Sequence, residues 1–401
     1  MAYLFFLRCL SPFTMSLTHT ISLGASLTPA DFLKYYWQKR PLLIRQAIPN
    51  FKSPITPKEL IDLACEESVE SRLILEKGGK NPWEVHYSPL EKKQFKRLPK
   101  THWTVLVQET NRYFTDAEDI LDQFRFIPNW RIDDLMMSYA VPEGSVGPHL
   151  DSYDVFLLQA HGKRRWQISR QQGDFIPDLE LRILREFTPE EEWILEPGDM
   201  LYLPPNVAHH GVAIDECMTF SIGFLAPSHT DMLNNYVTHT VMQLDSDHRY
   251  TDPDLSLQNE QGEISQAALD KIYPIIHSLP TDKHSINQWF GCFITEGRHH
   301  EGGEFDCPEP PYSPDEWLAE FAQTPCLRRA ARMAFIREGD NITLFAQGAA
   351  YPLIKKLAFV APLLTEQREL TYIALKPYFN DMEFVQLFTD FTNAGYLYFI
   401  E

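Results

Sequence analysis

Two histidines and one aspartate stand at a spacing that suits a metal site. The segment 147–151 contains His149 and Asp151, and residues two apart on a strand point to the same face. A third ligand must come from elsewhere in the chain, and His209 follows a turn and a strand that begin near Glu196. Together these three residues would form a facial triad of two histidines and one carboxylate.

Such a triad suits iron but does not by itself select it. It covers one face of an octahedral ion and leaves three positions for small ligands, the arrangement of Fe(II) oxygenases. Catalytic zinc sites also combine three ligands that can include a carboxylate, around a tetrahedral ion with one open position. The ligand types leave both metals open, so the residues that would bind a co-substrate have to decide.

An arginine on an apolar strand face is the deciding residue. In the segment 162–168, period-2 alternation puts Arg164 on one face with Trp166 and Ile168. An arginine among inward apolar residues needs an anion, and the far carboxylate of an iron-chelating dicarboxylate would accept two parallel hydrogen bonds from it. The alternative for Arg164 is a structural ion pair with an acidic neighbour.

A serine offers a second contact to the same co-substrate. Ser138 lies in the run 135–139, which reads as a strand, and its hydroxyl can donate to that carboxylate. A strand serine is also commonly a small polar residue that the backbone satisfies. Both roles stay open for Ser138.

The pattern of the chain around these residues changes twice. Residues 134–226 contain short β-branched and aromatic runs between Gly/Pro turns, which is typical of a small β-barrel or sandwich. Beyond 227, apolar residues at helical spacing form a stripe that either packs onto the barrel or makes a dimer interface. After a loop at 301–314, two apolar runs within 333–345 predict a hairpin between helices, as in a winged helix.

Composition and charge limit the class of protein and its partners. The 401 residues are 44% hydrophobic and 23% charged, as in an ordinary folded protein, and no stretch is apolar enough to span a membrane. A net charge of −19 disfavours general nucleic-acid binding and suits a basic partner. Six scattered cysteines without a Cys-x-x-Cys pair fit a reducing, cytoplasmic location. Residues 1–27 are expected to be a disordered or mis-started extension, with Met15 as an alternative initiator.

Five motifs along the chain carry a resemblance to a known family. They are WQKRP at 37–41, WRIDDLM at 130–136, GPHLD at 147–151 followed by YDVF at 153–156, PGD at 197–199 and PEPPY at 308–312. In these motifs the chain resembles the bacterial ribosomal oxygenases, JmjC proteins that use 2-oxoglutarate to hydroxylate a ribosomal-protein side chain. Two features depart from the family's pattern, namely the N-terminal extension and the doubled histidine at 209 and 210.

The resemblance implies a complete site. By it, His149, Asp151 and His209 fall on the iron ligands, and His209 rather than His210 stands at the family's distance from the preceding prolines. Arg164 falls on the partner of the co-substrate carboxylate, and Ser138 falls on a second co-substrate contact. The implied cofactors are Fe(II), 2-oxoglutarate as co-substrate, and O2.

The resemblance also implies an α+β architecture. A double-stranded β-helix (JmjC/cupin) barrel is expected at 28–227, a helical dimerisation region at 228–307 and a C-terminal winged-helix-like domain that reads no DNA at 308–401. The implied reaction is hydroxylation of the β-carbon (C3) of an arginine in a large-subunit ribosomal protein by a homodimeric enzyme.

Three alternatives stand beside this reaction. One is another JmjC activity, such as lysine demethylation or hydroxylation of a different protein. Another is a zinc or manganese cupin that acts as a hydrolase or isomerase, which would give Arg164 no reason to face inward. The third is a binding module that keeps the barrel for protein contacts and has lost catalysis.

Overall fold

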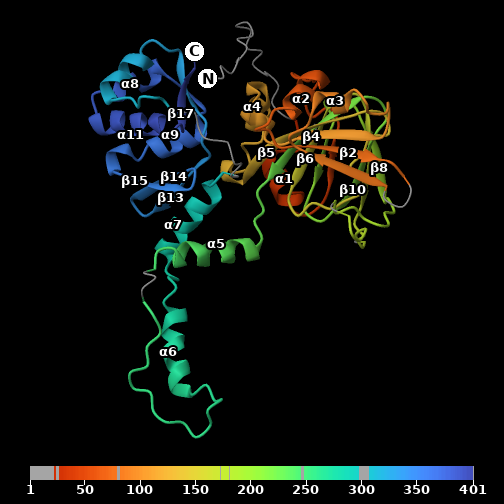
Figure 1. The fold of residues 1–401 in the computed structure, drawn as a ribbon. Helices are drawn as coiled ribbons and strands as arrows, with labels where there is room; N and C mark the ends of the chain where they lie inside the picture. Colours follow the sequence, from red (N-terminus) through yellow and green to blue (C-terminus); the bar gives the residue numbers. More distant parts are fainter. Residues whose placement is uncertain are drawn as a thin grey trace. The chain divides into compact units, whose positions relative to one another are not determined.

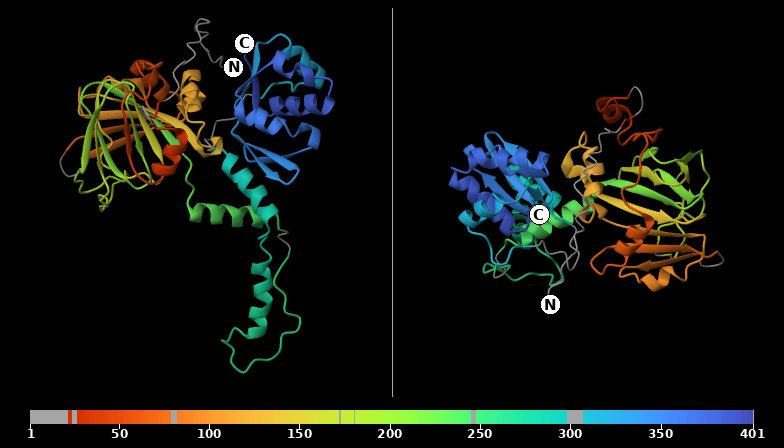
Figure 2. Two further views of the ribbon diagram at one scale, coloured as in Figure 1. Left: turned by 180° about the vertical axis from the view of Figure 1, so that it is seen from behind. Right: turned by 90° about the horizontal axis from the view of Figure 1, so that it is seen from above.

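The computed structural model describes residues 22–23, 27–78, 82–171, 173–179, 181–244, 248–297 and 307–400. The expected extension at 1–27, Met15 included, lies almost wholly outside the described residues. The chain divides into two compact units, Met1–Ala226 and Pro227–Glu401, which are described separately (Figures 1 and 2). Among the described helices, none combines the length and the apolar character that a membrane crossing requires.

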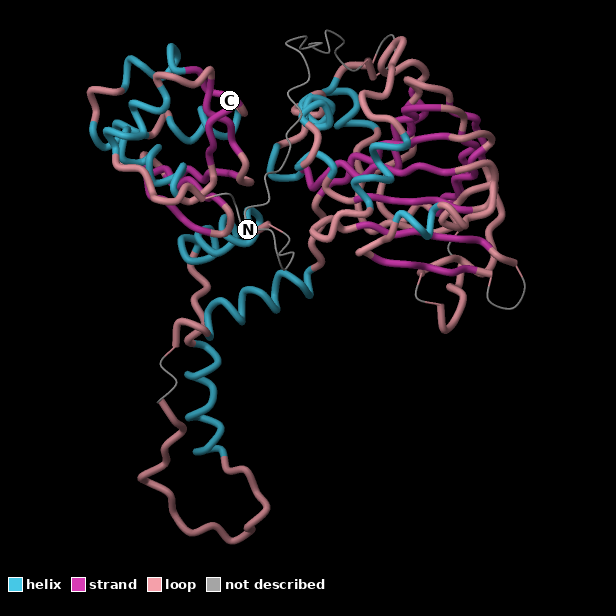
Figure 3. The backbone as a smooth tube through the Cα atoms, turned by 45° about the horizontal axis from the view of Figure 1, so that its top comes forward, coloured by secondary structure: helices cyan, strands magenta, loops and turns pink. Residues whose placement is uncertain are grey.

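The first unit is built on one large antiparallel sheet, whose strands run side by side in Figure 3. An antiparallel sheet can have different surroundings on its two faces. Here one face packs against the helices and the other faces the interior of the barrel. In spatial order the strands are β1 (Leu42–Ile44), β9 (Met200–Leu203), β6 (Val155–His161), β11 (Cys217–Phe224), β5 (Ile132–Ala140), β4 (Trp103–Val107), β2 (Ser71–Glu76) and β3 (Trp83–Tyr87).

A second, smaller sheet of the same unit closes the barrel. It consists of β10 (Ala208–Ala213), β7 (Arg164–Ser169) and β8 (Glu191–Leu195). Inward residues of both sheets pack into one cluster, in which Trp166 and Ile168 of β7 meet Leu157 and Leu201 of the large sheet. The double-stranded β-helix barrel and the mixed α+β class predicted from the sequence are therefore confirmed.

Helices pack on the outer face of the large sheet, and together with its strands they form the core of this unit. Phe32, Leu60 and Ile120 are fully buried there, one from each of three helices. The first two helices begin at capping boxes set by Thr28 and Thr56, which satisfy the free N–H groups of the first turn. The helices of this unit are α1 (Pro29–Tyr35), α2 (Pro57–Ala64), α3 (Lys92–Phe95) and α4 (Thr115–Asp122), with 3₁₀ turns η1 (Thr110–Arg112) and η2 (Asn129–Arg131).

The second unit contains helices and two small sheets around its own apolar core. The predicted hairpin is present, because β13 (Met333–Glu338) pairs with β14 (Asn341–Ala346), and β15 (Ala349–Leu353) extends it. The other sheet is β16 (Glu369–Thr371), β12 (Cys326–Arg329) and β17 (Leu397–Ile400). The helices are α5 (His229–Val241), α6 (Gln266–His277), α7 (Lys283–Thr295), α8 (Pro314–Phe321), α9 (Val360–Glu366), α10 (Tyr372–Leu375) and α11 (Met382–Asn393), with 3₁₀ turns η3 (Lys355–Leu357) and η4 (Lys376–Tyr378).

A glycine in β10 makes room for a tryptophan inside the barrel. Gly211 pairs with Trp166 across β10 and β7, and the indole lies over it. A Cβ at position 211 would stand 2.7 Å from Cη2 and from Cζ3 of Trp166. The ring of Trp166 in turn lies 5.9 Å from that of His209, so a side chain at 211 would push on the neighbourhood of that histidine.

We expect Gly211→Ala to lower the free energy of unfolding by roughly 1 to 3 kcal/mol, the usual cost of overpacking a filled interior. Urea unfolding followed by circular dichroism measures the change. Gly262→Ala is the matched control, because a Cβ at position 262 would have no neighbour within 4 Å. Equal stability of the two variants would contradict the close packing of Trp166 on Gly211.

Candidate metal centre

Backbone pairing brings the two histidines of the predicted triad together. His149 and His209 form an isolated antiparallel bridge, in which each N–H donates to the other residue's carbonyl oxygen at 3.0 and 2.9 Å. The N–H of Asn206 also donates to the carbonyl oxygen of Asp151 at 2.7 Å. The segment that carries the first two ligands is thus held against β10, which carries the third, and against the residues just before it.

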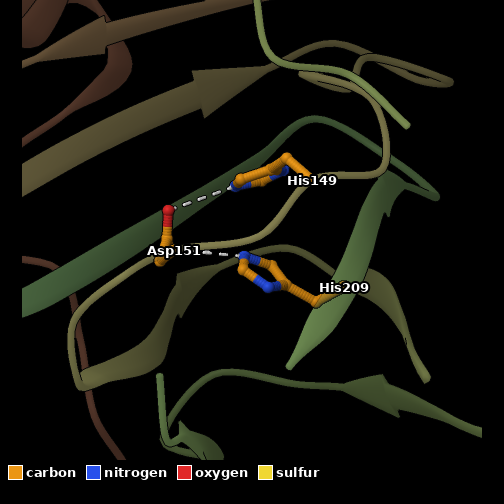
Figure 4. Close-up of side chains that lie close together, drawn as sticks. All are labelled: His149, Asp151 and His209. Carbon is orange, nitrogen blue, oxygen red and sulfur yellow. Dashed lines mark ion pairs between the residues drawn. The ribbon is translucent and has the colours of Figure 1, made fainter. Parts of the chain in front are cut away.

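The three side chains point toward one another (Figure 4). Their ligand atoms all lie within 4.8 Å of one another. Nε2 of His209 is 3.5 Å from Oδ2 of Asp151, and Nε2 of His149 is 3.9 Å from Oδ1 of the same carboxylate. This spacing is close enough for one ion to contact all three groups.

Each histidine is oriented by a carbonyl oxygen two residues before it. Nδ1 of His149 lies 2.9 Å from the oxygen of Gly147, and Nδ1 of His209 lies 3.0 Å from that of Val207. With the proton on Nδ1, each ring donates to its carbonyl and presents the lone pair of Nε2 to the centre. Such partners behind the ligands set the tautomer and the ring orientation in metal sites.

Electrostatics keep His209 in the form that a metal needs. Burial, followed by the nearby His149, lowers the pKa of His209 to about 4, so the ring is neutral at pH 7. Burial lowers the pKa of His210 to about 4 as well, so the pKa does not tell which of the two histidines is the ligand. Strand alternation distinguishes them, because His209 pairs with Ile168 on the inner face, whereas His210 pairs with Gln167 and packs against the ring of Phe187.

Arg164 lies inside the barrel with two unsatisfied nitrogens. It is 3% exposed, and it alternates inward with Trp166 and Ile168 as the sequence pattern predicts. Within the described residues, its Nε and Nη2 atoms are buried without a hydrogen-bond partner, and no carboxylate pairs with the guanidinium. The structural ion pair considered for Arg164 is therefore not observed in the described part of the chain. Burying a guanidinium in this state is costly, and an anion that accepted its hydrogen bonds would offset the cost.

Ser138 is buried in the middle of β5, on the inner face of the large sheet. It pairs with Thr219 of β11, and its hydroxyl donates to the carbonyl oxygen of Thr219 at 3.2 Å. The side chain of Thr219 continues this polar row by donating to Gln159 at 3.2 Å. The backbone contact matches the structural role considered for Ser138, and its predicted contact with a co-substrate stays a prediction.

Two residues near the centre were not selected from the sequence. Asp134 is buried on β5, on the same face as Ser138. Although Tyr153 is 42% exposed, desolvation raises the pKa of its phenol well above the usual range, and the charges of Asp151 and Asp134 add to the rise. Tyr153 follows Asp151 by two residues in the chain, and Asp134 accepts a hydrogen bond from the N–H of Glu109 at 2.9 Å. Asp134 could have been found from the sequence, because it stands four residues before Ser138 and strand alternation places both on the same face.

Asp154 anchors the ligand segment from behind. Its side chain is fully buried and accepts hydrogen bonds from the hydroxyl of Tyr202 at 2.6 Å and from Nε2 of Gln38 at 2.9 Å. Its backbone oxygen accepts from Phe224 at 3.2 Å. A buried carboxylate with such donors holds the chain that follows Asp151 in one place.

Comparison with known proteins places these features in a family. Residues 119–232 match the model of the JmjC domain, and residues 278–398 match the model of the ROXA-like winged helix. The ribosomal protein uL16 3-hydroxylase of Escherichia coli (strain K12) is 35% identical over 373 residues, which cover 92% of this chain and 97% of that protein. A probable ribosomal oxygenase of Haemophilus influenzae is 39% identical over 271 residues, or 66% of each chain.

Solved structures agree over nearly the whole length. The X-ray structure of E. coli ycfD is 33% identical, with a TM-score of 0.80 over 94% of this chain and 99% of that one. A structure of the E. coli ribosomal oxygenase YcfD in complex with cobalt and 2-oxoglutarate has a TM-score of 0.78, is 33% identical, and covers 96% of this chain and all of that one. The predicted barrel with a C-terminal winged helix is confirmed, and the chain belongs to the JmjC-domain ribosomal oxygenases.

Proposed function

We propose that this chain is an Fe(II)- and 2-oxoglutarate-dependent dioxygenase that hydroxylates the β-carbon (C3) of an arginine in a large-subunit ribosomal protein. The observation that carries the proposal is the buried guanidinium of Arg164, inside the barrel that also holds the triad, whose Nε and Nη2 have no hydrogen-bond partner among the described residues. The family relationship supports it, because the E. coli relative is named a ribosomal protein uL16 3-hydroxylase.

In this proposal His149, Asp151 and His209 hold the metal. Two imidazoles and one carboxylate match a facial triad, which leaves positions for a chelating co-substrate and for O2. A zinc hydrolase would use the same ligand types but would leave Arg164 buried without an anion. Iron with an anionic co-substrate therefore accounts for more of the site, and cobalt with 2-oxoglutarate in the related YcfD structure is consistent with it.

The chain's own groups bind and orient the co-substrate. The guanidinium of Arg164 donates to the far carboxylate of 2-oxoglutarate, and the hydroxyl of Ser138 adds a second donor. The indole of Trp166 and the side chain of Ile168, both buried, line the same face and exclude water from it. When bound, the iron centre supplies the conversion of 2-oxoglutarate and O2 to succinate and CO2, with insertion of one oxygen atom into a C–H bond.

Charge supports a basic protein substrate. The chain carries a net charge of −19, which attracts a basic ribosomal protein over a distance. The buried carboxylate of Asp134 adds negative charge on the inner face of β5. The product mass separates this reaction from demethylation, since hydroxylation adds one oxygen whereas demethylation removes a methyl group. The cytoplasm, where ribosomal proteins are made, is the proposed location.

We expect His209→Ala to abolish the gain of one oxygen on ribosomal proteins, because it removes a metal ligand. Mass spectrometry after incubation with Fe(II), 2-oxoglutarate and O2 measures the product. His210→Ala is the comparison variant: it should keep the gain of one oxygen, with at most a weaker metal affinity, because His210 supplies no ligand to the centre. The reverse result would show that the third ligand has been assigned to the wrong histidine.

We expect Arg164→Ala to raise the KM for 2-oxoglutarate roughly 10- to 100-fold, the effect of losing charge-assisted hydrogen bonds worth about 1.5 to 3 kcal/mol. Succinate formation at varied 2-oxoglutarate concentration measures the KM. Arg165→Ala is the control, because Arg165 stands on the same strand and alternates to the outer face. An unchanged KM in Arg164→Ala would remove the proposed carboxylate contact.

We also infer a homodimer formed through the helical region at 228–307, with the winged-helix-like domain at 308–401 making no DNA contact. The predicted stripe on α5 is exposed, with Leu233 at 64%, Val237 at 42% and Val241 at 52%. On α6 no residue is buried, and Ile272 and Ile276 lie one turn apart on its surface. Apolar helical faces of this kind favour association with a second copy.

We expect light scattering to give a mass of twice 46.6 kDa for the wild-type protein. The double variant Ile272→Asp with Ile276→Asp should give the mass of a single chain, because two buried charges would oppose the interface. Ile373→Asp, at a position that is 82% exposed outside the helical region, is the control and should stay dimeric. A wild-type protein with the mass of one chain would contradict the dimer.

A further inference from the structure

The connection between β7 and β8 folds back on itself. Ile176 donates its N–H to the carbonyl oxygen of Ile183 at 2.8 Å, and Arg185 donates to that of Asp174 at 2.8 Å. An isolated antiparallel bridge joins Phe175 to Leu184 in the same connection. Residues 173–187, described at 173–179 and 181–187, therefore form two short antiparallel arms, which we name the β7–β8 hairpin.

The returning arm of the β7–β8 hairpin lies on the segment that precedes the first predicted ligand. The N–H of Leu184 donates to the carbonyl oxygen of Pro148 at 2.8 Å. Ile183 is 2% exposed, and a Cβ at position 147 would stand 2.8 Å from its Cδ1 and 2.9 Å from its Cγ2. Ile183 thus fills the space beside Gly147 that a side chain there would need. The φ of Gly147, +81°, also favours glycine at this position.

Gly147 in turn holds the first histidine. Its carbonyl oxygen is the group that lies 2.9 Å from Nδ1 of His149 and so sets the orientation of that ring. Ile183 therefore packs beside the glycine whose carbonyl oxygen orients the imidazole of His149. Positioning by a group behind the ligand is a recurrent source of metal affinity.

The far end of the same hairpin contacts the strand that bears the third predicted ligand. The ring of Phe187 meets that of His210 edge-on, with centroids 5.9 Å apart and planes at 85°. Because the ring of His210 stands on the outer face of β10, this contact braces the strand directly behind His209. One short connection thus touches both segments that carry the triad.

We propose that the β7–β8 hairpin is a clamp that holds His149 and His209 in register for metal binding, with Ile183 as its main positioning residue. This inference rests on the metal site of the proposed function. A hairpin that merely covers the barrel would contribute to stability and leave metal affinity unchanged. A clamp contributes to both, so the two roles give different measurements.

The test is a Co(II) titration of the metal-free full-length protein, followed through the visible absorption bands of the bound ion. We expect Ile183→Ala to weaken Co(II) binding on the order of 10- to 100-fold, the range seen when groups behind metal ligands are changed. Ile183→Val removes only Cδ1, the atom nearest position 147, and should give a smaller loss. Ile194→Ala, at a residue of β8 that is 45% exposed, is the matched control and should bind as the wild type does.

Thermal unfolding of each variant is recorded beside the titration, so that binding is measured only where the protein is folded. If Ile183→Ala fails to fold, Ile183→Val carries the test. Wild-type affinity and spectrum in the folded Ile183 variants, with only a lower unfolding temperature, would overturn the clamp. A wild-type protein that binds no Co(II) would instead overturn the metal site itself, so the two failures are distinguishable.

Discussion

The backbone pair between His149 and His209 is the contact on which the rest of the site depends. It joins a segment without regular structure to β10 through two hydrogen bonds, and it sets two rings with their centroids 4.2 Å apart. Asp151 follows in the same segment and reaches both rings with its carboxylate. The site is therefore a consequence of strand pairing, and the barrel provides the edge to which the segment pairs.

Buried polar groups behind the site explain why distant motifs belong to it. Asp154 carries a carboxylate into the core, where an unpaired charge would be costly, and Gln38 and Tyr202 donate to it. The motif at 37–41 is thereby tied to the segment that follows Asp151, although the two are far apart in the chain. This network accounts for a motif that has no chemical role of its own.

The interior of the barrel is divided between apolar packing and a polar row. Trp166 and Ile168 pack with the apolar cluster, whereas Ser138, Thr219 and Arg164 bring polar groups into the same enclosed space. Two nitrogens of the Arg164 guanidinium are buried without a hydrogen-bond partner in the described part of the chain, and the proposed dicarboxylate would offset that cost by accepting their hydrogen bonds. The chain tolerates this local penalty at the place where a co-substrate would sit, as strained or unsatisfied groups commonly mark function.

The sequence by itself determined the residue types of the triad, the inward face of Arg164 and the barrel pattern, because these depend on local alternation along an extended chain. Only the tertiary structure decided that His209 faces His149 while His210 turns toward Phe187, since strand pairing selects the face. It also decided that Ile183 packs beside Gly147. Such contacts join segments separated in sequence, and no local periodicity encodes which segments will meet.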